Sequence, residues 1–242
     1  MALQGQRVVV IGGTSGIGLE TAKAATALGA EVTVVGRDEH KLRAALAALG
    51  GGASGLSVDA SDRTALERFF EQVQQLDHLV LAASGAAGAG PIASLDLDEL
   101  RAGFEAKLFP HLSAVQLALP RLSDTGSVTF IASASPNAPY TGVAGLSAIN
   151  GALEAIVPGL AVELKPIRVN AISPGVIDTP WWSGLPEEDR NAVFSQYGGA
   201  APVGRIGAPE EVAQAIVAVM SNGFITGTVL TIDGGLRYTV AA

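Results

Sequence analysis

Residues 7–18, RVVVIGGTSGIG, decide the fold expected for this chain. The run over 7–11 is short, β-branched and almost continuously apolar, which is typical of a strand buried on both faces of a parallel sheet. Glycines follow at once, and they allow backbone N–H groups to approach a phosphate at the positive end of the next helix. A tight turn without a ligand is the competing interpretation. The residues expected to hold a pyrophosphate are Gly12, Thr14, Ser15, Gly16, Ile17 and Gly18.

Strand and helix patterns alternate along the rest of the chain. Further strands are expected at 31–35, 55–60, 77–83, 126–133, 167–173 and 227–233, and helices at 17–28, 38–49, 62–75, 96–122, 145–164 and 209–220. Such alternation predicts one single-domain α/β fold over 1–242, a Rossmann-type doubly wound parallel sheet of about seven strands with helices on both faces. The least regular stretch, about 174–208, follows the sixth strand. We expect it to form the substrate loops, because ligands bind at the carboxyl ends of such strands.

The composition limits the classes of function. The 242 residues are 48% hydrophobic and 16% charged, with a net charge of −8, which argues against nucleic acid or an anionic membrane as partner. The chain has no cysteine, and its three histidines are far apart, so we expect no metal site. We expect no apolar run as long as the roughly 18 residues of a membrane span. Together with a start that lacks a signal-peptide pattern, this predicts a cytoplasmic protein with a small-molecule substrate.

Arg37 follows the second expected strand, at the position that reads the ribose of a bound dinucleotide. An acidic residue there favours NAD, whereas an arginine can hold the 2′-phosphate of NADP through charge-assisted hydrogen bonds. Asp38 comes next, but it is also a good N-cap for the helix that follows. We therefore expect NADP(H) to be preferred over NAD(H), with a solvated Arg37 as the other interpretation.

Placed in order, these segments resemble the short-chain dehydrogenase/reductase family over essentially the whole chain. GGTSGIG (12–18) is similar to its glycine motif, and AASG (82–85) is a reduced form of its N-N-A-G. SPGVIDTP (173–180) is similar to its P-G-x-x-x-T segment. The resemblance implies that Asp59 meets the adenine. It also implies further cofactor contacts at Ala83, Gly85, Pro174, Ile177 and Thr179.

The catalytic positions depart from that family, which uses Ser, Tyr and Lys together with an Asn on the preceding long helix. Ser133 fits the serine position, but Leu146 stands thirteen residues later where the tyrosine is expected, and Asn150 stands in place of the lysine. Leucine has no proton to give. Asn150 can still hydrogen-bond a ribose hydroxyl, although it carries no charge.

Lys107 occupies the position of the family's helix asparagine, in FEAKLF. It can bring an ammonium into the site and act as the acid, or it can be an ordinary exposed helical lysine. Tyr140 is a second candidate acid, although a loop tyrosine more often packs with its hydroxyl at the surface. Ser135 is a weaker alternative to Ser133. Trp181 and Trp182 can form an apolar lid or take part in packing.

Two hypotheses about function follow from this pattern. The first is an NADP(H)-dependent oxidoreductase of a small carbonyl or activated-alkene compound, with a non-standard proton donor. The second is a non-redox NADP(H)-binding protein, either a sensor or a catalytically silent subunit, because fold alone does not fix function. The resemblance also implies a homo-oligomer, a tetramer or a dimer.

Overall fold

Seven parallel strands form one sheet in the computed structural model, which describes residues 2–85, 87–135 and 140–239. Their order is β3-β2-β1-β4-β5-β6-β7, and every neighbouring pair is parallel. The strands are β1 Arg7–Ile11, β2 Glu31–Gly36, β3 Ala53–Ser57, β4 Leu76–Leu81, β5 Leu122–Ile131, β6 Arg168–Pro174 and β7 Val229–Ile232. The predicted doubly wound parallel sheet is confirmed.

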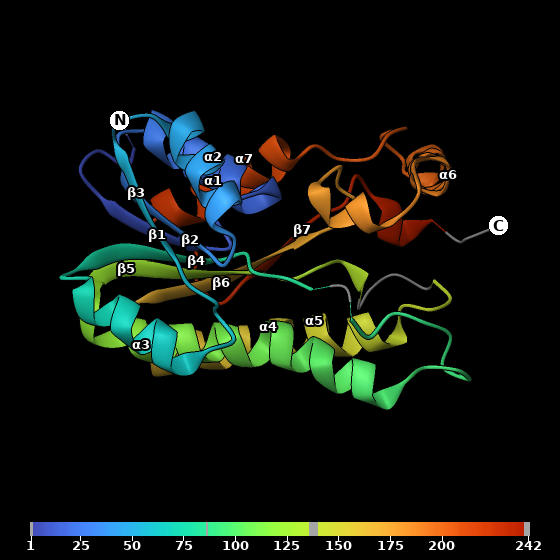
Figure 1. Ribbon diagram of the computed structural model, residues 1–242, viewed down its shortest axis with the longest axis horizontal. Helices are drawn as coiled ribbons and strands as arrows, with labels where there is room; N and C mark the ends of the chain where they lie inside the picture. The colour runs from blue at the N-terminus through green and yellow to red at the C-terminus, as the bar shows by residue number, and fades with distance from the viewer. Residues whose placement is uncertain (1, 86, 136–139, 240–242) are drawn as a thin grey trace.

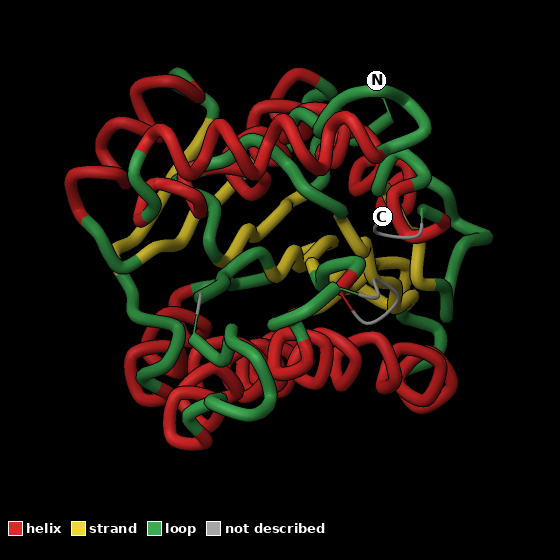
Figure 2. Tube along the Cα trace, turned by 90° about the vertical axis from the view of Figure 1, so that its right-hand side faces the viewer, coloured by secondary structure: helices red, strands yellow, loops and turns green. Residues whose placement is uncertain are grey.

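Helices cover both faces of the sheet, so that the molecule has three layers (Figures 1 and 2). The helices are α1 Gly16–Ala27, α2 Glu39–Leu49, α3 Arg63–Gln72, α4 Leu97–Ala118, α5 Ala144–Glu163, α6 Glu187–Ala200 and α7 Pro209–Ser221. Buried side chains of α1, α2 and α7 form one apolar core on one face, and those of α3, α4 and α5 form the second core on the other face. The central strands β1, β4, β5 and β6 are largely buried because they contact both cores, whereas the edge strand β3 is mostly exposed.

Aspartates fix where three of the helices begin. The Asp38 carboxylate accepts a hydrogen bond from the Lys41 N–H at 2.9 Å, which starts α2. Asp62 accepts from Thr64 and Ala65 at the start of α3, and Asp96 caps α4 in the same way. Each cap satisfies at least one N–H that the helix itself leaves unpaired, and so stabilises the start of its helix.

The strand order reverses between β1 and β4, and this switch point opens the crevice in which the site lies. Gly12 leaves β1 with φ of 82°, and a Cβ there would lie 2.5 Å from the backbone nitrogen of Ala83, beyond β4. A Cβ on Gly18 would collide with the carbonyl of Gly12. Only glycine permits this close approach of loop, strand and helix.

Some boundaries differ from those expected. The region 174–208 is less irregular than predicted, because it contains α6 and a short 3₁₀ helix at Pro180–Gly184. Helix α6 buries only Gly198, so its sequence lacks the apolar stripe from which a helix could be predicted. Strand β5 begins four residues early, and β3 ends at Ser57 instead of continuing to residue 60.

Helix α5 is long and apolar enough to cross a membrane by length and composition, with a mean hydropathy of 1.4 over 18 residues. It is not a continuous apolar run, because Ser147, Asn150 and Glu154 interrupt it. In the fold, α5 packs on the sheet, where Leu153 and Val157 join the core. Its outer face stays apolar, and Val162 is 72% exposed there.

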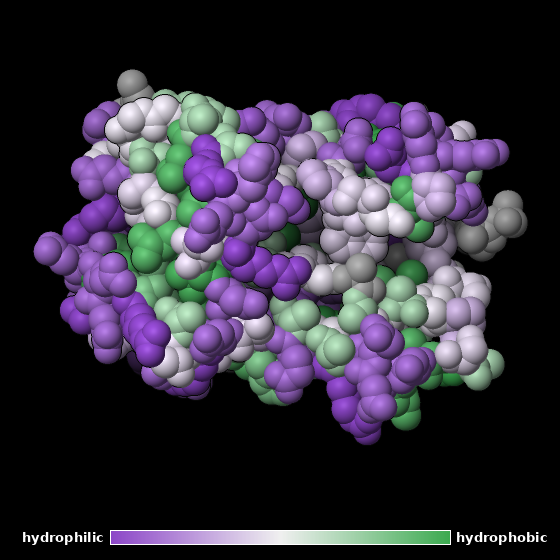
Figure 3. Space-filling view, viewed as in Figure 1, coloured by the Kyte–Doolittle hydropathy of each residue, from purple (hydrophilic) through white to green (hydrophobic). Residues whose placement is uncertain are grey.

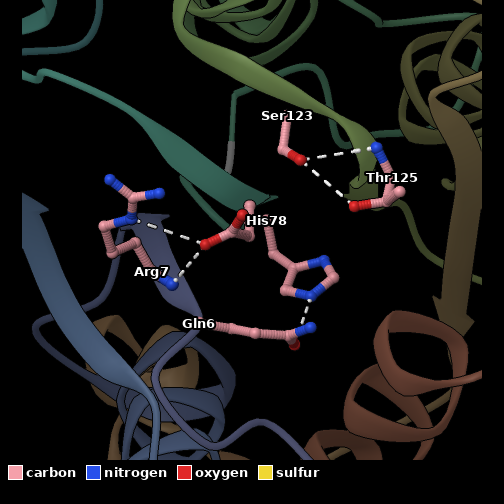
Figure 4. Close-up of polar contacts among 6 residues, drawn as sticks. Gln6, Arg7, His78, Ser123 and Thr125 are labelled. Carbon is pink, nitrogen blue, oxygen red and sulfur yellow. Dashed lines mark hydrogen bonds and ion pairs between the residues drawn. The ribbon is translucent and has the colours of Figure 1, made fainter.

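A buried histidine lies near the start of β4, in the middle of the sheet. His78, on β4, is 2% exposed, and its Nδ1 lies 2.7 Å from the Ser127 hydroxyl. Its Nε2 donates to the Gln6 side-chain oxygen at 3.0 Å (Figure 4). Burial, together with the nearby charge of Arg168, lowers the pKa of His78 to about 4. His78 is therefore held neutral, with both ring nitrogens satisfied.

We predict that acid destabilises the protein through His78. Its folded-state pKa lies below the unfolded value of 6.5, so its stabilising effect is present above pH 6.5 and is lost as the pH falls toward 4. The loss is on the order of 3 kcal/mol. Urea unfolding of the His78→Asn variant between pH 7 and 5 should show a pH slope shallower by about one proton. The exposed His40, changed to Asn, is the control, and equal slopes in His78→Asn and wild type would refute the assignment.

Candidate functional site

One cavity of about 1010 Å³ runs along the carboxyl ends of the strands. A recess between the two helix layers is visible in Figure 3. Every residue predicted for the site lines this one cavity. They are Gly12, Thr14, Ser15, Gly16, Ile17, Gly18, Arg37, Asp59, Ala83, Gly85, Lys107, Ser133, Tyr140, Asn150, Pro174, Ile177 and Thr179. The geometry brings them together, although they come from segments far apart in the sequence.

One end of the cavity is formed by the loop after β1 and the start of α1. Ser15 is the N-cap residue of α1, and its hydroxyl makes no capping hydrogen bond to the described helix. No hydrogen bond among the described residues occupies the first N–H groups of α1 or the hydroxyls of Thr14 and Ser15, so these donors can meet a ligand. A helix N-terminus with these donors attracts an anion such as a phosphate.

Arg37 and Asp59 line the neighbouring part of the cavity. The Asp38 carboxylate is occupied in capping α2, which leaves the exposed Arg37 as the charged group at the end of β2. Asp59 accepts hydrogen bonds from the backbone and hydroxyl of Ser61 at 2.9 and 2.7 Å. These bonds, with the charge of Arg37, lower the pKa of Asp59. Asp59 is thus an ionised acceptor held in place.

Lys107 is buried in the middle of α4, with 6% of its surface exposed. The alternative of an ordinary exposed lysine is therefore excluded. Its Nζ donates to the Asn150 side-chain oxygen at 2.7 Å and to the carbonyl of Ala132 at 3.3 Å. One N–H of the ammonium remains for the cavity. The lysine on α4 and the asparagine on α5 thus form a direct contact across the site.

Burial lowers the pKa of Lys107 to about 8, while the charge of Glu154 opposes the shift. Glu154 lies one turn after Asn150 on α5, and its carboxylate accepts from the Ser173 hydroxyl at 2.6 Å. The pKa of Glu154 is raised by its own burial. Lys107 can therefore exist in both protonation states near neutral pH, which is what acid–base chemistry needs.

Two hydroxyls follow the end of β5 and line the cavity. Ser133 Oγ accepts a long hydrogen bond of 3.4 Å from the Ser135 N–H. Ser135 Oγ accepts from the Asn150 side-chain nitrogen at 3.3 Å. The carbonyl of Ser135 accepts from the Ser147 hydroxyl at 2.7 Å, which ties this segment to α5.

Aromatic side chains form the opposite wall. Tyr140 packs edge-to-face on Tyr197 of α6, with ring centroids 5.0 Å apart, and its buried hydroxyl has no partner among the described residues. The indole of Trp181 donates to the carbonyl of Gly85 at 3.3 Å, across the cavity from the loop after β4. Trp182 donates to Ile177 and packs against Trp181. The tryptophans therefore bridge the two sides, in agreement with the lid interpretation.

Sequence reasoning missed part of this wall. Tyr197 lies on the unpredicted helix α6, and Asp233, Leu236 and Arg237 reach the cavity from beyond β7. No motif pointed to them. His111, one turn after Lys107, was also missed: its Nε2 donates to the carbonyl of Ala83 at 3.0 Å, and burial lowers its pKa to about 3. Over the described ranges, no group of three acidic or histidine side chains is arranged to hold a metal ion.

Comparison with known proteins extends over nearly the whole chain. A family model described as Enoyl-(Acyl carrier protein) reductase matches residues 11–237. The Short-chain dehydrogenase/reductase ATR9 of Stachybotrys chlorohalonatus is 32% identical, and the match covers 96% of this chain and 97% of that relative.

Solved structures agree with this match. A small-chain dehydrogenase in complex with NADPH is similar with a TM-score of 0.86 and 31% identity, over 97% of this chain and 100% of that one. The MalC Reductase/Diels-Alderase from Malbranchea aurantiaca has a TM-score of 0.89 and 26% identity, over 98% and 97% of the two chains.

The contact between Lys107 and Asn150 predicts strong coupling in stability. Asn150→Leu should lower the free energy of unfolding at pH 7 by about 3 kcal/mol, because it leaves a buried ammonium without its closest acceptor. The double variant Lys107→Met/Asn150→Leu should recover more than half of that loss. The loss of unfolding free energy caused by Asn150→Leu should be smaller at pH 9.5, where Lys107 is mostly neutral in the folded state. Urea unfolding of the wild type, of the single variants Lys107→Met and Asn150→Leu and of the double variant measures these free energies, and additive, pH-independent losses would contradict the coupling.

Proposed function

The chain belongs to the short-chain dehydrogenase/reductase family, and we propose that it is an NADP(H)-dependent oxidoreductase with a non-standard proton donor. Its substrate would be a small carbonyl or activated-alkene compound. The observation that carries the proposal is the buried Lys107 ammonium at the wall of the cavity that also contains every residue suited to a dinucleotide. A site with no chemistry to perform would have little reason to retain a buried charge, because an ammonium is costly to bury.

The shape of the cavity fits the cofactor. Gly12 and Gly18 leave room that a Cβ would fill, and the N-terminus of α1 faces that room. Arg37 supplies a guanidinium for a 2′-phosphate, and Asp59 supplies an acceptor for the adenine. The similar small-chain dehydrogenase was solved with NADPH, which supports the same class of cofactor here. We assign further backbone contacts to Ala83, Gly85, Pro174, Ile177 and Thr179, following the family pattern.

The catalytic positions are rearranged. Leu146 and Asn150 replace the family's tyrosine and lysine, and Lys107 replaces its helix asparagine. The lysine and the asparagine have in effect exchanged helices and remain in contact. The positively charged side chain therefore comes from α4 instead of α5. Asn150 keeps one lone pair of its oxygen for a ribose hydroxyl, because its N–H groups already donate to Leu146 and Ser135.

We assign the following roles to these residues in a carbonyl reduction. NADPH, held by the glycine loop and Arg37, would supply a hydride for the carbonyl carbon. Ser133 hydrogen-bonds the substrate oxygen, which becomes an alkoxide. Lys107 gives that oxygen a proton from its remaining N–H, becomes a neutral amine, and recovers the proton from water. With an activated alkene, the same ammonium neutralises the enolate oxygen. Tyr140, whose hydroxyl has no described partner, is the alternative acid.

One observation favours a second candidate function, a non-redox NADP(H)-binding protein. Leu146 puts an apolar side chain where the family's acid stands, so proton transfer depends wholly on a replacement. In that case the protein would be a sensor or a silent subunit. For either function we propose a cytoplasmic homo-oligomer, a dimer or a tetramer, packed through α4 and α5. Phe109 and Val162 are 49% and 72% exposed on those helices and supply apolar contact area.

Hydride transfer can be tested without a known substrate. The protein is incubated with NADPH deuterated at the transferable position and a small-molecule extract, and products that gain one deuterium are sought by mass spectrometry. We expect a labelled product, and we expect Lys107→Met to lower its rate of formation by at least about a hundredfold. NADPH affinity should stay within about threefold.

The other outcomes separate the alternatives. A rate within about threefold of wild type in Lys107→Met would remove Lys107 as the acid and favour Tyr140, which Tyr140→Phe then tests. No labelled product, with NADPH bound in the same sample, would favour the non-redox function.

Arg37 should determine cofactor preference. Arg37→Ala is expected to weaken NADPH binding by about tenfold or more, because a charge-assisted hydrogen bond to the 2′-phosphate is lost, while NADH binding changes little. Fluorescence titration of both cofactors measures this difference. Arg43→Ala, on the exposed face of α2 and away from the cavity, is the matched control. Equal losses for NADPH and NADH would contradict 2′-phosphate recognition.

A further inference from the structure

The hydrogen bonds around Asn150 connect the Lys107 ammonium to a second hydroxyl, that of Ser135. Lys107 Nζ donates to the Asn150 oxygen, and the Asn150 nitrogen donates to Ser135 Oγ. The amide orientation is fixed, because a flipped amide would place its NH₂ group against the ammonium. The same nitrogen also donates to the carbonyl of Leu146 at 2.8 Å, which holds the side-chain amide against the preceding turn of α5.

This arrangement determines what the Ser135 hydroxyl can do. Its oxygen already accepts from Asn150, so its proton must be donated elsewhere. Within the part of the chain that the structure describes, no atom is recorded as accepting that proton, and Ser135 lines the cavity. The positive charge of Lys107 polarises the amide, and the polarised amide makes the serine a stronger donor.

Hydrogen bonds also fix the position of the Ser135 backbone. Its carbonyl accepts from Ser147, and its N–H donates to Ser133 Oγ. Ser133 has no recorded hydrogen bond to Asn150 or Lys107 in the described chain, and its one recorded bond is long, at 3.4 Å. Among the described residues, the Ser135 hydroxyl accepts directly from the amide that binds the buried ammonium, whereas the Ser133 hydroxyl does not.

We propose that Ser135 is a further catalytic residue, a hydroxyl that donates to the reacting oxygen of the substrate, and that Lys107 and Asn150 position and polarise it. This inference rests on the proposed function, because it needs an oxygen that gains negative charge in the cavity. Ser135 stabilises that oxygen by hydrogen bonding and transfers no proton. The preferred substrates are those whose oxygen becomes an alkoxide or enolate, and a phenolate imitates that charge.

The test uses p-nitrophenol as the probe, because its absorption spectrum reports both binding and ionisation. The NADP⁺-loaded protein is titrated with it at pH 7, and the affinity for the phenolate is measured. We expect Ser135→Ala to weaken phenolate binding by at least about tenfold, and Ser135→Thr to restore it to within about threefold. Ser147→Ala removes the hydrogen bond to the Ser135 carbonyl without removing a cavity hydroxyl. It should weaken phenolate binding less than Ser135→Ala does.

A double variant tests the route through Asn150. Ser135→Ala/Asn150→Leu should bind phenolate no more weakly than the weaker single variant, because both changes break one chain of hydrogen bonds. The proposal would be overturned if the losses of the two single variants were additive, or if Ser135→Ala changed phenolate binding by less than about twofold. It would also be overturned if Ser135→Thr failed to restore binding, or if the wild type bound no phenolate. Phenolate binding does not require turnover. Failure of hydride transfer in the deuterium experiment is therefore distinguishable from failure of the Ser135 assignment.

Discussion

The close approach between the loop after β1 and the exit of β4 is the constraint on which the rest depends. Gly12 lies against the backbone of Ala83, and Gly18 lies against Gly12, so strand, loop and helix meet with no side chain between them. This contact sits where the strand order reverses. It directs the N-terminus of α1 into the crevice and brings the ends of β4 and β5 beside it, which is why the residues proposed for the cofactor and those proposed for catalysis share one cavity.

The second constraint is electrostatic. An ammonium buried in α4 needs acceptors, and Asn150 and the carbonyl of Ala132 supply two. Glu154, one turn after Asn150 on α5, supplies a negative charge, and its carboxylate accepts a hydrogen bond from Ser173. A hydrophobic residue would fill the position of Lys107 more cheaply, since burying an ion pair rarely adds stability. The arrangement therefore supports the proposed role of Lys107 in chemistry, because a lysine with a perturbed pKa in a cleft is a candidate for acid–base work.

The sequence could predict the sheet, the glycine loop after β1 and many of the residues that line the cavity, because each follows from local patterns and from the rule that ligands bind at the carboxyl ends of parallel strands. It could not predict α6, which carries no apolar stripe, and with it Tyr197 was missed. It also left Lys107 undecided between surface and cavity. That choice depends on how α4 is rotated against β5 and α5, a tertiary property that a single lysine in a helical pattern does not reveal.

Leu146 limits where a replacement acid can stand. With an apolar side chain at that position, the α5 side of the cavity offers a reacting oxygen no proton, and Asn150 on the next turn offers no charge. Charge on the oxygen must then be met from α4 and from the segment after β5. The polar contacts run in that direction, from Lys107 through Asn150 to Ser135. If Leu146 and Asn150 occupy the family's tyrosine and lysine positions as proposed, a tyrosine at 146 alone would not recreate the family site, because the buried ammonium belongs to α4 and is paired with the Asn150 amide.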